Sequence, residues 1–166
     1  MAVMVTSFDL QKLGSLLRDF YEIAHIRITV FDESLNELIS YPSEVAPYCR
    51  VIRGTAKGYK ACMECDKKAC ATAAKIRNTH IYKCHAGLTE AVTPLYVGGV
   101  LAGYLMFGHV FSYDDREAGV QAIEKICEPY HVNNRLLREA LAEAVPLSKG
   151  YIKSAAQILH AVASYL

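Results

Sequence analysis

Residues 91–111 read AVTPLYVGGVLAGYLMFGHVF, and this stretch decides the fold. It predicts two strands, Ala91 to Val97 and Val100 to Phe111, because each is an apolar run bounded by turn residues. The dipeptide Gly98-Gly99 between them is a strong signal for a tight hairpin turn. Both strands are apolar on both faces, so we expect helices or a second subunit to cover each side of the pair.

Further strands are predicted outside this hairpin. Ile26, Ile28 and Val30 alternate with Arg27 and Thr29, which is the pattern of a strand with one buried face. The other predicted strands are Glu37 to Tyr41 and Ile81 to Ala86. Sequential hairpins of this kind favour an antiparallel sheet.

Helices are predicted before, between and after the strands, from apolar residues that recur every three or four positions. In the first helix Ser7 is the candidate cap, and Ile23 belongs to the apolar face. In the long third helix the apolar stripe is Cys62, Cys65, Ala69, Ala73 and Ile76. The predicted helices are Phe8 to Ala24, a turn at Tyr48 to Ile52, Thr55 to Asn78, Asp114 (cap) to Cys127, Asn133 or Asn134 to Ala144, and Ser148 to Leu166. The sequence therefore predicts an α+β fold, an antiparallel sheet flanked by helices.

Composition narrows the class of protein. The 166 residues fit one domain, and 52% of them are hydrophobic, which is enough for a buried core. The charge is nearly balanced, with 18 basic and 17 acidic residues, so we expect no direct binding to nucleic acid or to a membrane. Six cysteines without an export signal indicate a reducing compartment, and we expect a cytoplasmic location.

The cysteines form the most specific chemical pattern. Cys62 and Cys65 are three residues apart on a helix and share one face, while strand alternation places Cys84 on the same side as Tyr82. Together with Cys49 they are candidate ligands for zinc or an iron–sulfur cluster, or the thiols of a redox switch. Free cysteines also pack as small buried hydrophobes, so a purely structural role stays open.

The sequence carries no organised catalytic motif. It lacks a glycine-rich phosphate loop, a nucleophile elbow and a paired-carboxylate motif. His85 follows Cys84 directly, but neighbouring strand residues point to opposite faces, so these two side chains should not pair. His109 is either a structural histidine or a polar anchor at a pocket mouth. We therefore predict a protein that is not an enzyme, with a thiol enzyme using Cys84 or Cys62 as the remaining alternative.

A family resemblance follows from particular residues. They are Tyr48-Cys49, Cys62, Cys65-Asp66, the run Tyr82-Lys83-Cys84-His85-Ala86-Gly87-Leu88, Pro94, Gly98-Gly99, Gly103 and Gly108-His109. In these positions, over roughly residues 7–125, the chain resembles the PocR sensory-domain family. That resemblance implies a PAS-like ligand-binding module joined to an output domain, with short hydrocarbon derivatives such as diols as ligands. In that family Gln often follows the glycine where this chain has His109.

The resemblance and the aromatic, glycine-rich strands together predict a small-molecule pocket. Its candidate ligand-binding residues are Tyr48, Cys49, Tyr82, Cys84, Tyr104 and His109, and Cys62 and Cys65 are expected in its lining. We expect a single sensory domain over residues 1–166, with a core at about 7–145 and a terminal helix at 148–166. The predicted function is sensing a small organic molecule and relaying that signal to the output domain; a metal or redox sensor is the alternative.

The terminal helix carries a short heptad-like pattern. Ile152, Leu159 and Leu166 are seven residues apart, which is the spacing of a coiled-coil seam. We predict that this helix joins two subunits and carries the signal. Packing of the same stripe on the domain's own sheet is the alternative.

Overall fold

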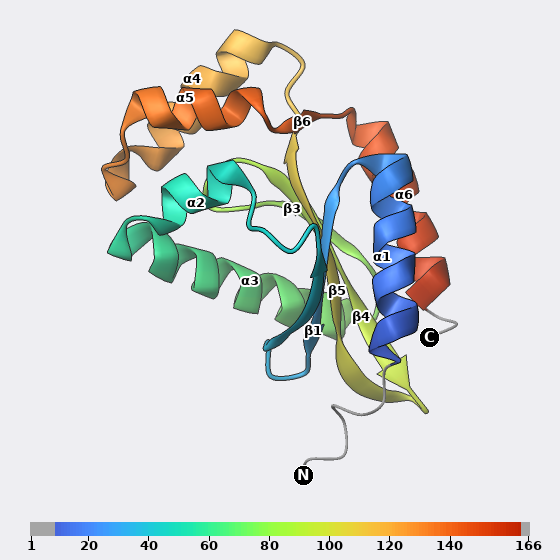
Figure 1. Ribbon diagram of the computed structural model, residues 1–166. Helices are drawn as coiled ribbons and strands as arrows, with labels where there is room; N and C mark the ends of the chain where they lie inside the picture. Colours follow the sequence, from blue (N-terminus) through green and yellow to red (C-terminus); the bar gives the residue numbers. More distant parts are fainter. Residues whose placement is uncertain (1–8, 164–166) are drawn as a thin grey trace.

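A computed structural model describes residues 9–163 as one antiparallel sheet flanked by helices (Figure 1). The strands are β1 (Arg27–Asp32), β2 (Glu37–Tyr41), β3 (His80–Lys83), β4 (Thr89–Val97), β5 (Val100–Phe111) and β6 (Val145–Pro146). The helices are α1 (Leu10–Ala24), α2 (Pro47–Arg53), α3 (Ala56–Ile76), α4 (Arg116–Cys127), α5 (Asn134–Ala142) and α6 (Lys149–Ala163), with a 3-10 turn at Glu128–Tyr130. This is an α+β fold of the PAS-like kind, as predicted.

The hairpin predicted from residues 91–111 forms the centre of the sheet. The strand order is β2-β1-β5-β4-β3, and Val97 pairs with Val100 across the turn. Gly98 and Gly99 have φ values of 59° and 80°, a left-handed conformation that glycine adopts without steric cost. The short strand β6, which the sequence pattern did not reveal, adds a parallel pair to the end of β5.

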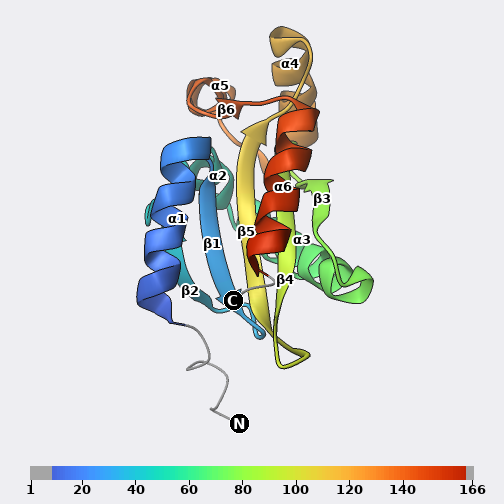
Figure 2. The same ribbon diagram turned by 90° about the vertical axis from the view of Figure 1, so that its right-hand side faces the viewer.

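Helices cover both faces of the sheet, as the apolar strands require (Figure 2). On one face, α1 and α6 pack over an aliphatic cluster that includes Leu17, Ile28, Leu105 and Leu159. On the opposite face, α3 packs against β4 and β5 through Ala69, Cys70 and Ala73. Strand β1 contributes to both faces, because Ile28 and Val30 enter the aliphatic cluster while Arg27 and Thr29 point the other way.

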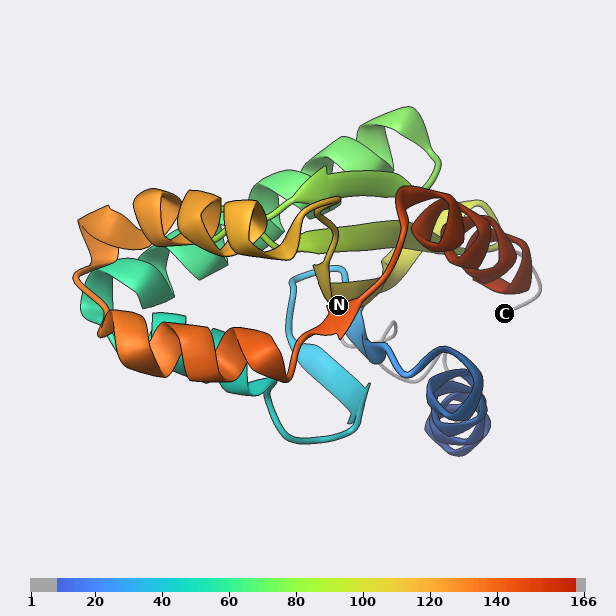
Figure 3. The ribbon, with the colours of Figure 1, turned by 90° about the horizontal axis from the view of Figure 1, so that it is seen from above.

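Helices α4 and α5 lie over one end of the sheet (Figure 3). Their apolar residues Ile123 and Leu137 are fully buried with Ile52 of α2 and Leu88. This cluster anchors α2 and the turn between β3 and β4. Both segments belong to the candidate site described below.

Most element ends agree with the sequence pattern, and the differences have local causes. Asp9 caps α1 through the Lys12 amide, while the predicted cap Ser7 and the first predicted helical residue, Phe8, lie outside the described residues. Asp115, rather than Asp114, caps α4 by accepting from the Ala118 amide. Strand β3 ends at Lys83, because the Cys84 amide bonds to the Leu88 carbonyl and closes a tight turn.

Two residues assigned to buried helix faces are exposed. Ile23 is 80% exposed and Ile76 is 52% exposed, so these two assignments are wrong. Each lies in the last turn of its helix, on the side that faces away from the sheet, since Ala24 and Ala73 close by are buried. The long helix α3 also runs through Gly58 without interruption, because Thr55 caps it through the Gly58 amide.

The terminal helix packs on its own domain. Ile152 and Leu159 are 2% and 3% exposed and belong to the aliphatic cluster beneath α1 and α6, while Leu166 lies outside the described residues. The predicted dimer seam is therefore wrong for Ile152 and Leu159, since these side chains are already buried against the sheet. Within residues 9–163, no helix is long and apolar enough to span a membrane.

Candidate functional site

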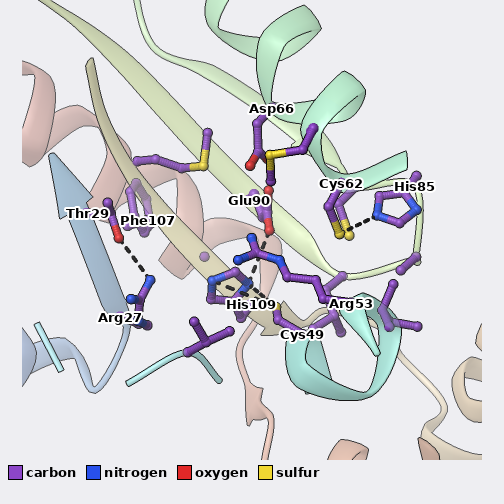
Figure 4. Close-up of a pocket in the computed structure, with 18 of the residues that line it drawn as sticks. Arg27, Thr29, Cys49, Arg53, Cys62, Asp66, His85, Glu90, Phe107 and His109 are labelled. Atoms are coloured by element: carbon purple, nitrogen blue, oxygen red, sulfur yellow. Dashed lines mark hydrogen bonds and ion pairs between the residues drawn. The ribbon is translucent and has the colours of Figure 1, made fainter. Parts of the chain in front are cut away.

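A cavity of about 240 Å³ lies between the sheet and helices α2 and α3. Its wall combines aliphatic residues with an unusual number of ionisable side chains, as Figure 4 shows. The polar members are Arg27, Thr29, Glu37, Cys49, Arg53, Cys62, Asp66, Cys84, His85, Glu90 and His109. Because buried polar groups are costly unless paired, each must be accounted for by a partner or by a ligand.

A β-bulge directs His109 into this cavity. Thr89 pairs with Val110 but Ala91 pairs with Phe107, so β5 carries one extra residue at Gly108–His109. His109 has φ 64°, which is uncommon for a residue other than glycine. Phe107 and Val110 both enter the aliphatic cluster although they are three residues apart. The bulge thus frees His109 from strict alternation and turns it toward the cavity.

His109 joins a buried hydrogen-bonded network. Its Nδ1 lies 3.1 Å from Cys49 Sγ and 3.2 Å from Glu90 Oε1, and Tyr82 donates its hydroxyl to Glu90 Oε2 at 2.7 Å. Burial alone would lower the pKa of His109, yet Cys49 and Glu90 outweigh it and raise the pKa to about 10. Burial would likewise raise the pKa of Glu90, but His109 and Tyr82 lower it. An imidazolium and a carboxylate therefore face each other at neutral pH.

Gly108 permits this arrangement. A Cβ on Gly108 would lie 2.6 Å from the Glu90 side chain and 2.8 Å from its Cα, closer than real Cβ atoms approach. Any larger residue would push Glu90 away from His109. The Gly108-His109 pair is thus the sequence feature that brings Glu90 and His109 together.

Arg53 and Asp66 are two charged groups of the cavity wall whose burial is only partly compensated. Arg53 Nε is buried without a hydrogen-bond partner among the described residues. For Asp66, burial first and the nearby Glu90 carboxylate second raise the pKa to about 7, against the lowering effect of Arg53 and His109. A donor and an acceptor therefore face the cavity from α2 and α3, as expected of groups that bind a ligand.

Arg27 holds the loop that follows β2. Its Nε donates to the carbonyls of Pro42 and Glu44 at 3.0 and 2.9 Å, and its Nη1 donates to Thr29 Oγ1 at 2.9 Å. A second cavity of about 260 Å³ lies on the other side of this residue, and Arg27, Tyr48 and His109 line both. Arg27 thus fixes the loop after β2 by hydrogen bonds and forms part of the wall between the two cavities.

A second cysteine–histidine pair stands on another part of the wall. Cys62 Sγ lies 2.9 Å from His85 Nε2, and the opposite nitrogen, Nδ1, lies 2.7 Å from the Tyr130 hydroxyl. As predicted, His85 does not pair with its neighbour Cys84. Its partner comes instead from α3, which no local sequence pattern identifies.

The structure brings together most of the residues predicted for the pocket. Tyr48, Cys49, Cys62, Cys84 and His109 line the cavity. The Tyr48 hydroxyl donates to the Ala86 carbonyl, so this residue contributes its ring to the wall. Burial raises the pKa of the Cys84 thiol well above its usual value.

Three predicted residues lie outside the cavity wall. Tyr82 lies behind the wall and reaches the site through the contacts of its hydroxyl with Glu90 and Met106. Tyr104 packs with Ala69 and Met106 in the cluster between α3 and the sheet, further along β5 from the bulge than Met106, which does line the cavity. Cys65 contacts the backbone of His85 but not the cavity.

Of the four cysteines predicted as metal ligands, three line the cavity and one does not. Cys49, Cys62 and Cys84 line the cavity, and Cys65 does not. In the part of the chain that the structure describes, no three His, Cys, Asp or Glu side chains are grouped as ligands of one metal ion. Binding of zinc or an iron–sulfur cluster at these residues stays a prediction.

The sequence reasoning did not place five charged residues in the pocket. These are Arg27, Glu37, Arg53, Asp66 and Glu90. A signal for Glu90 was present, since it is a single charge beside the apolar run of β4, where it is only 6% exposed. Arg27 and Glu37 lie at the starts of strands and Arg53 and Asp66 lie in helices, where charged residues are ordinarily solvated, so only the packing of α2 and α3 on the sheet distinguishes them.

Comparisons with known proteins agree with this architecture. A family model described as the sensory domain found in PocR matches residues 6–166. The regulatory protein PocR of Salmonella typhimurium is 25% identical over 118 residues, which cover 69% of this chain and 38% of that protein. The matched region thus spans well under half the length of this curated relative.

Proposed function

This chain belongs to the PocR sensory-domain family, and we propose that it is the ligand-binding sensory domain of a regulatory protein. The proposal rests above all on one observation, the cavity with Arg53 and Asp66 facing it. A concave, partly apolar pocket with convergent polar groups is the usual form of a small-molecule site. The domain binds its ligand and releases it unchanged.

We propose a short, hydroxyl-bearing hydrocarbon derivative as the ligand. A water molecule takes about 30 Å³ in the liquid, so the cavity has room for roughly eight non-hydrogen atoms. A hydroxyl group both donates and accepts hydrogen bonds, and a vicinal diol can serve the Asp66 carboxylate and the Arg53 guanidinium together. The apolar part of the wall, including Ile52, Leu88 and Phe107, suits the carbon chain.

The signal is proposed to leave through α6. This helix packs on β4, and Thr93 of β4 lies within hydrogen-bond distance of His160 Nδ1 at 3.2 Å. Because β4 also carries Glu90, a ligand that moves the Glu90 network would displace the strand that supports α6. A linked output domain, a homodimer and a cytoplasmic location remain parts of this proposal.

Thermal unfolding with a series of short 1,2-diols tests the ligand class. A ligand that binds only the folded state stabilises it by about 2.7 kcal/mol at 100 times its Kd, so the melting temperature should rise with diol concentration. Asp66→Asn should weaken binding about 10- to 100-fold, because a hydrogen bond to a charged group contributes about 1.5–3 kcal/mol.

Glu64→Gln is the matched control, since Glu64 is exposed on the same helix two residues away. It should leave binding unchanged. Equal stabilisation of wild type and Asp66→Asn by every diol would show that this cavity is not the diol site. Conversion of the diol during the incubation would contradict simple sensing.

A metal or redox sensor is the second candidate. The observation that favours it is the presence of two nitrogen–sulfur pairs, Cys49 with His109 and Cys62 with His85, on one cavity wall. Metal analysis and the visible spectrum of protein purified without oxygen distinguish this candidate. Stoichiometric metal that is lost in Cys62→Ala would favour it over the diol sensor.

A further inference from the structure

Three segments that are distant in sequence build a chain of hydrogen bonds around one thiol. Cys62 comes from α3, His85 from the turn after β3, and Tyr130 from the 3-10 turn after α4. The Cys62 thiol lies 2.9 Å from His85 Nε2, and Tyr130 contacts the opposite ring nitrogen at 2.7 Å. This is the order of nucleophile, base and orienting group that activates cysteine and serine nucleophiles.

At neutral pH the Cys62–His85 pair consists of a protonated thiol and a neutral imidazole. Burial raises the pKa of Cys62 to about 11, although Arg53 opposes this, and burial lowers the pKa of His85. At neutral pH the thiol therefore donates to Nε2, and the Nδ1 proton of His85 is donated to the Tyr130 hydroxyl. A thiol in this state is a poor free nucleophile, but its proton has a base in direct contact.

Arg53 supplies the third group that carbonyl addition needs. It interacts with the Cys62 thiol, it lines the same cavity, and its Nε has no hydrogen-bond partner among the described residues. A guanidinium beside the attacked carbon can stabilise the negative charge that develops on a carbonyl oxygen. Thiol, base and oxygen-binding donor therefore face one cavity.

We propose that Cys62 captures a small aldehyde as a reversible hemithioacetal. The Cys62 sulfur bonds to the carbonyl carbon while its proton passes to His85 Nε2. The electron pair of the carbonyl π bond moves to the oxygen beside Arg53, and this oxygen then takes the proton from His85. Atoms and charge balance without an oxidant, and reversal releases thiol and aldehyde unchanged. This inference rests on the proposed function, since it names a second ligand class for the same cavity.

Carbon-13 NMR with acetaldehyde labelled at the carbonyl carbon tests the inference. In wild type, one equivalent of label should move from the aldehyde and hydrate signals to that of a carbon bonded to sulfur and oxygen. Cys62→Ala should lose this signal entirely. Cys65→Ala should keep it, because Cys65 lies one helical turn away with its thiol outside the cavity wall.

His85→Gln and Tyr130→Phe separate a chemical role from a structural one. His85→Gln should slow adduct formation about 100-fold or more, the range of general-base assistance, while the amount formed at equilibrium changes much less. Tyr130→Phe should slow it to a smaller extent. If the rate of adduct formation and the amount of adduct at equilibrium fall by the same factor in both variants, His85 and Tyr130 only shape the cavity.

The diol experiment keeps the two proposals distinct. Glu64→Gln, an exposed residue of the same helix, should keep both the diol-dependent rise in melting temperature and the adduct signal. A wild type that responds to diols but forms no adduct would overturn the covalent inference and leave the sensory proposal standing. Adduct that persists in Cys62→Ala and disappears in Cys49→Ala would overturn the assignment to Cys62.

Discussion

The two faces of the sheet are made from alternate residues of the same strands, yet they differ in kind. On β1, Ile28 and Val30 enter an aliphatic cluster beneath α1 and α6, whereas Arg27 and Thr29 point to the cavity beneath α2 and α3. On β5, Leu105 and Met106 are consecutive and face opposite ways. The first face is closely packed; the second holds a cavity surrounded by ionisable groups.

This difference shows where folding stability and function reside. Burying aliphatic side chains stabilises the fold by about 25 cal/mol for each Å² removed from water. Burying Asp66, Glu90 and His109 is costly and is offset only where these groups pair. We infer that the α1–α6 face carries the stability that allows the cavity face to keep groups ready for a ligand.

Among truncations of a side chain to alanine, the largest expected effect comes from a matched pair on β5. Leu105→Ala should reduce the free energy of unfolding by about 2–5 kcal/mol, because Leu105 is fully buried in the aliphatic cluster. Met106→Ala should reduce the free energy of unfolding by a smaller amount, since Met106 already borders a cavity. Urea denaturation of both variants measures the difference. Equal losses would show that the two faces contribute alike to stability.

His109→Gln should reduce stability at neutral pH by about 1.5–3 kcal/mol, as for a hydrogen bond to a charged group. The folded pKa of about 10 lies above the usual 6.5, so the stabilisation by protonated His109 is complete below about pH 6.5. It is lost progressively as the pH rises to about 10. Melting temperatures across this range should fall more steeply in wild type than in the variant; parallel curves would contradict a charged His109.

Asp66→Asn should increase stability by about 0.5–2 kcal/mol while weakening ligand binding, a common exchange at functional sites. The folded pKa of about 7 lies above the usual 3.8, so ionised Asp66 destabilises the fold increasingly above pH 3.8. The gain in stability of Asp66→Asn over wild type should be complete above about pH 7 and absent near pH 4. A gain that is independent of pH would mean that burial of the charge is not its cause.

The smallest effect is expected on the outer side of α6. Ile158 is 60% exposed, so Ile158→Glu should change the unfolding free energy by less than about 0.5 kcal/mol. Leu159→Glu, one residue further, should unfold the domain because it places a charge in the aliphatic cluster. Light scattering on folded Ile158→Glu also tests the homodimer: a dimeric wild type that becomes monomeric would locate the subunit contact on this side of α6.

The sequence predicted the elements better than the site. Strand β1 and the hairpin β4–β5 were found because alternation and paired glycines are local signals, although β4 begins at Thr89 rather than at the predicted Ala91. Five of the eight residues expected in the pocket wall line the cavity, namely Tyr48, Cys49, Cys62, Cys84 and His109. The missed residues Arg27, Arg53 and Asp66 carry no local signal, because a charged residue in a helix or at a strand end is ordinarily solvated.

What the sequence by itself determined is the order of elements, the apolar hairpin at the centre of the sheet and the family to which the chain belongs. These depend on neighbours in the chain, where side-chain period and turn residues act over a few positions. Only the tertiary structure decided which groups meet. The bulge at Gly108–His109 is defined by its register against β4, and it joins His109 to Glu90 and Cys49. Likewise, Cys62, His85 and Tyr130 meet because α3, the β3–β4 turn and the end of α4 pack around one cavity, and packing between distant segments leaves no periodic trace in the sequence.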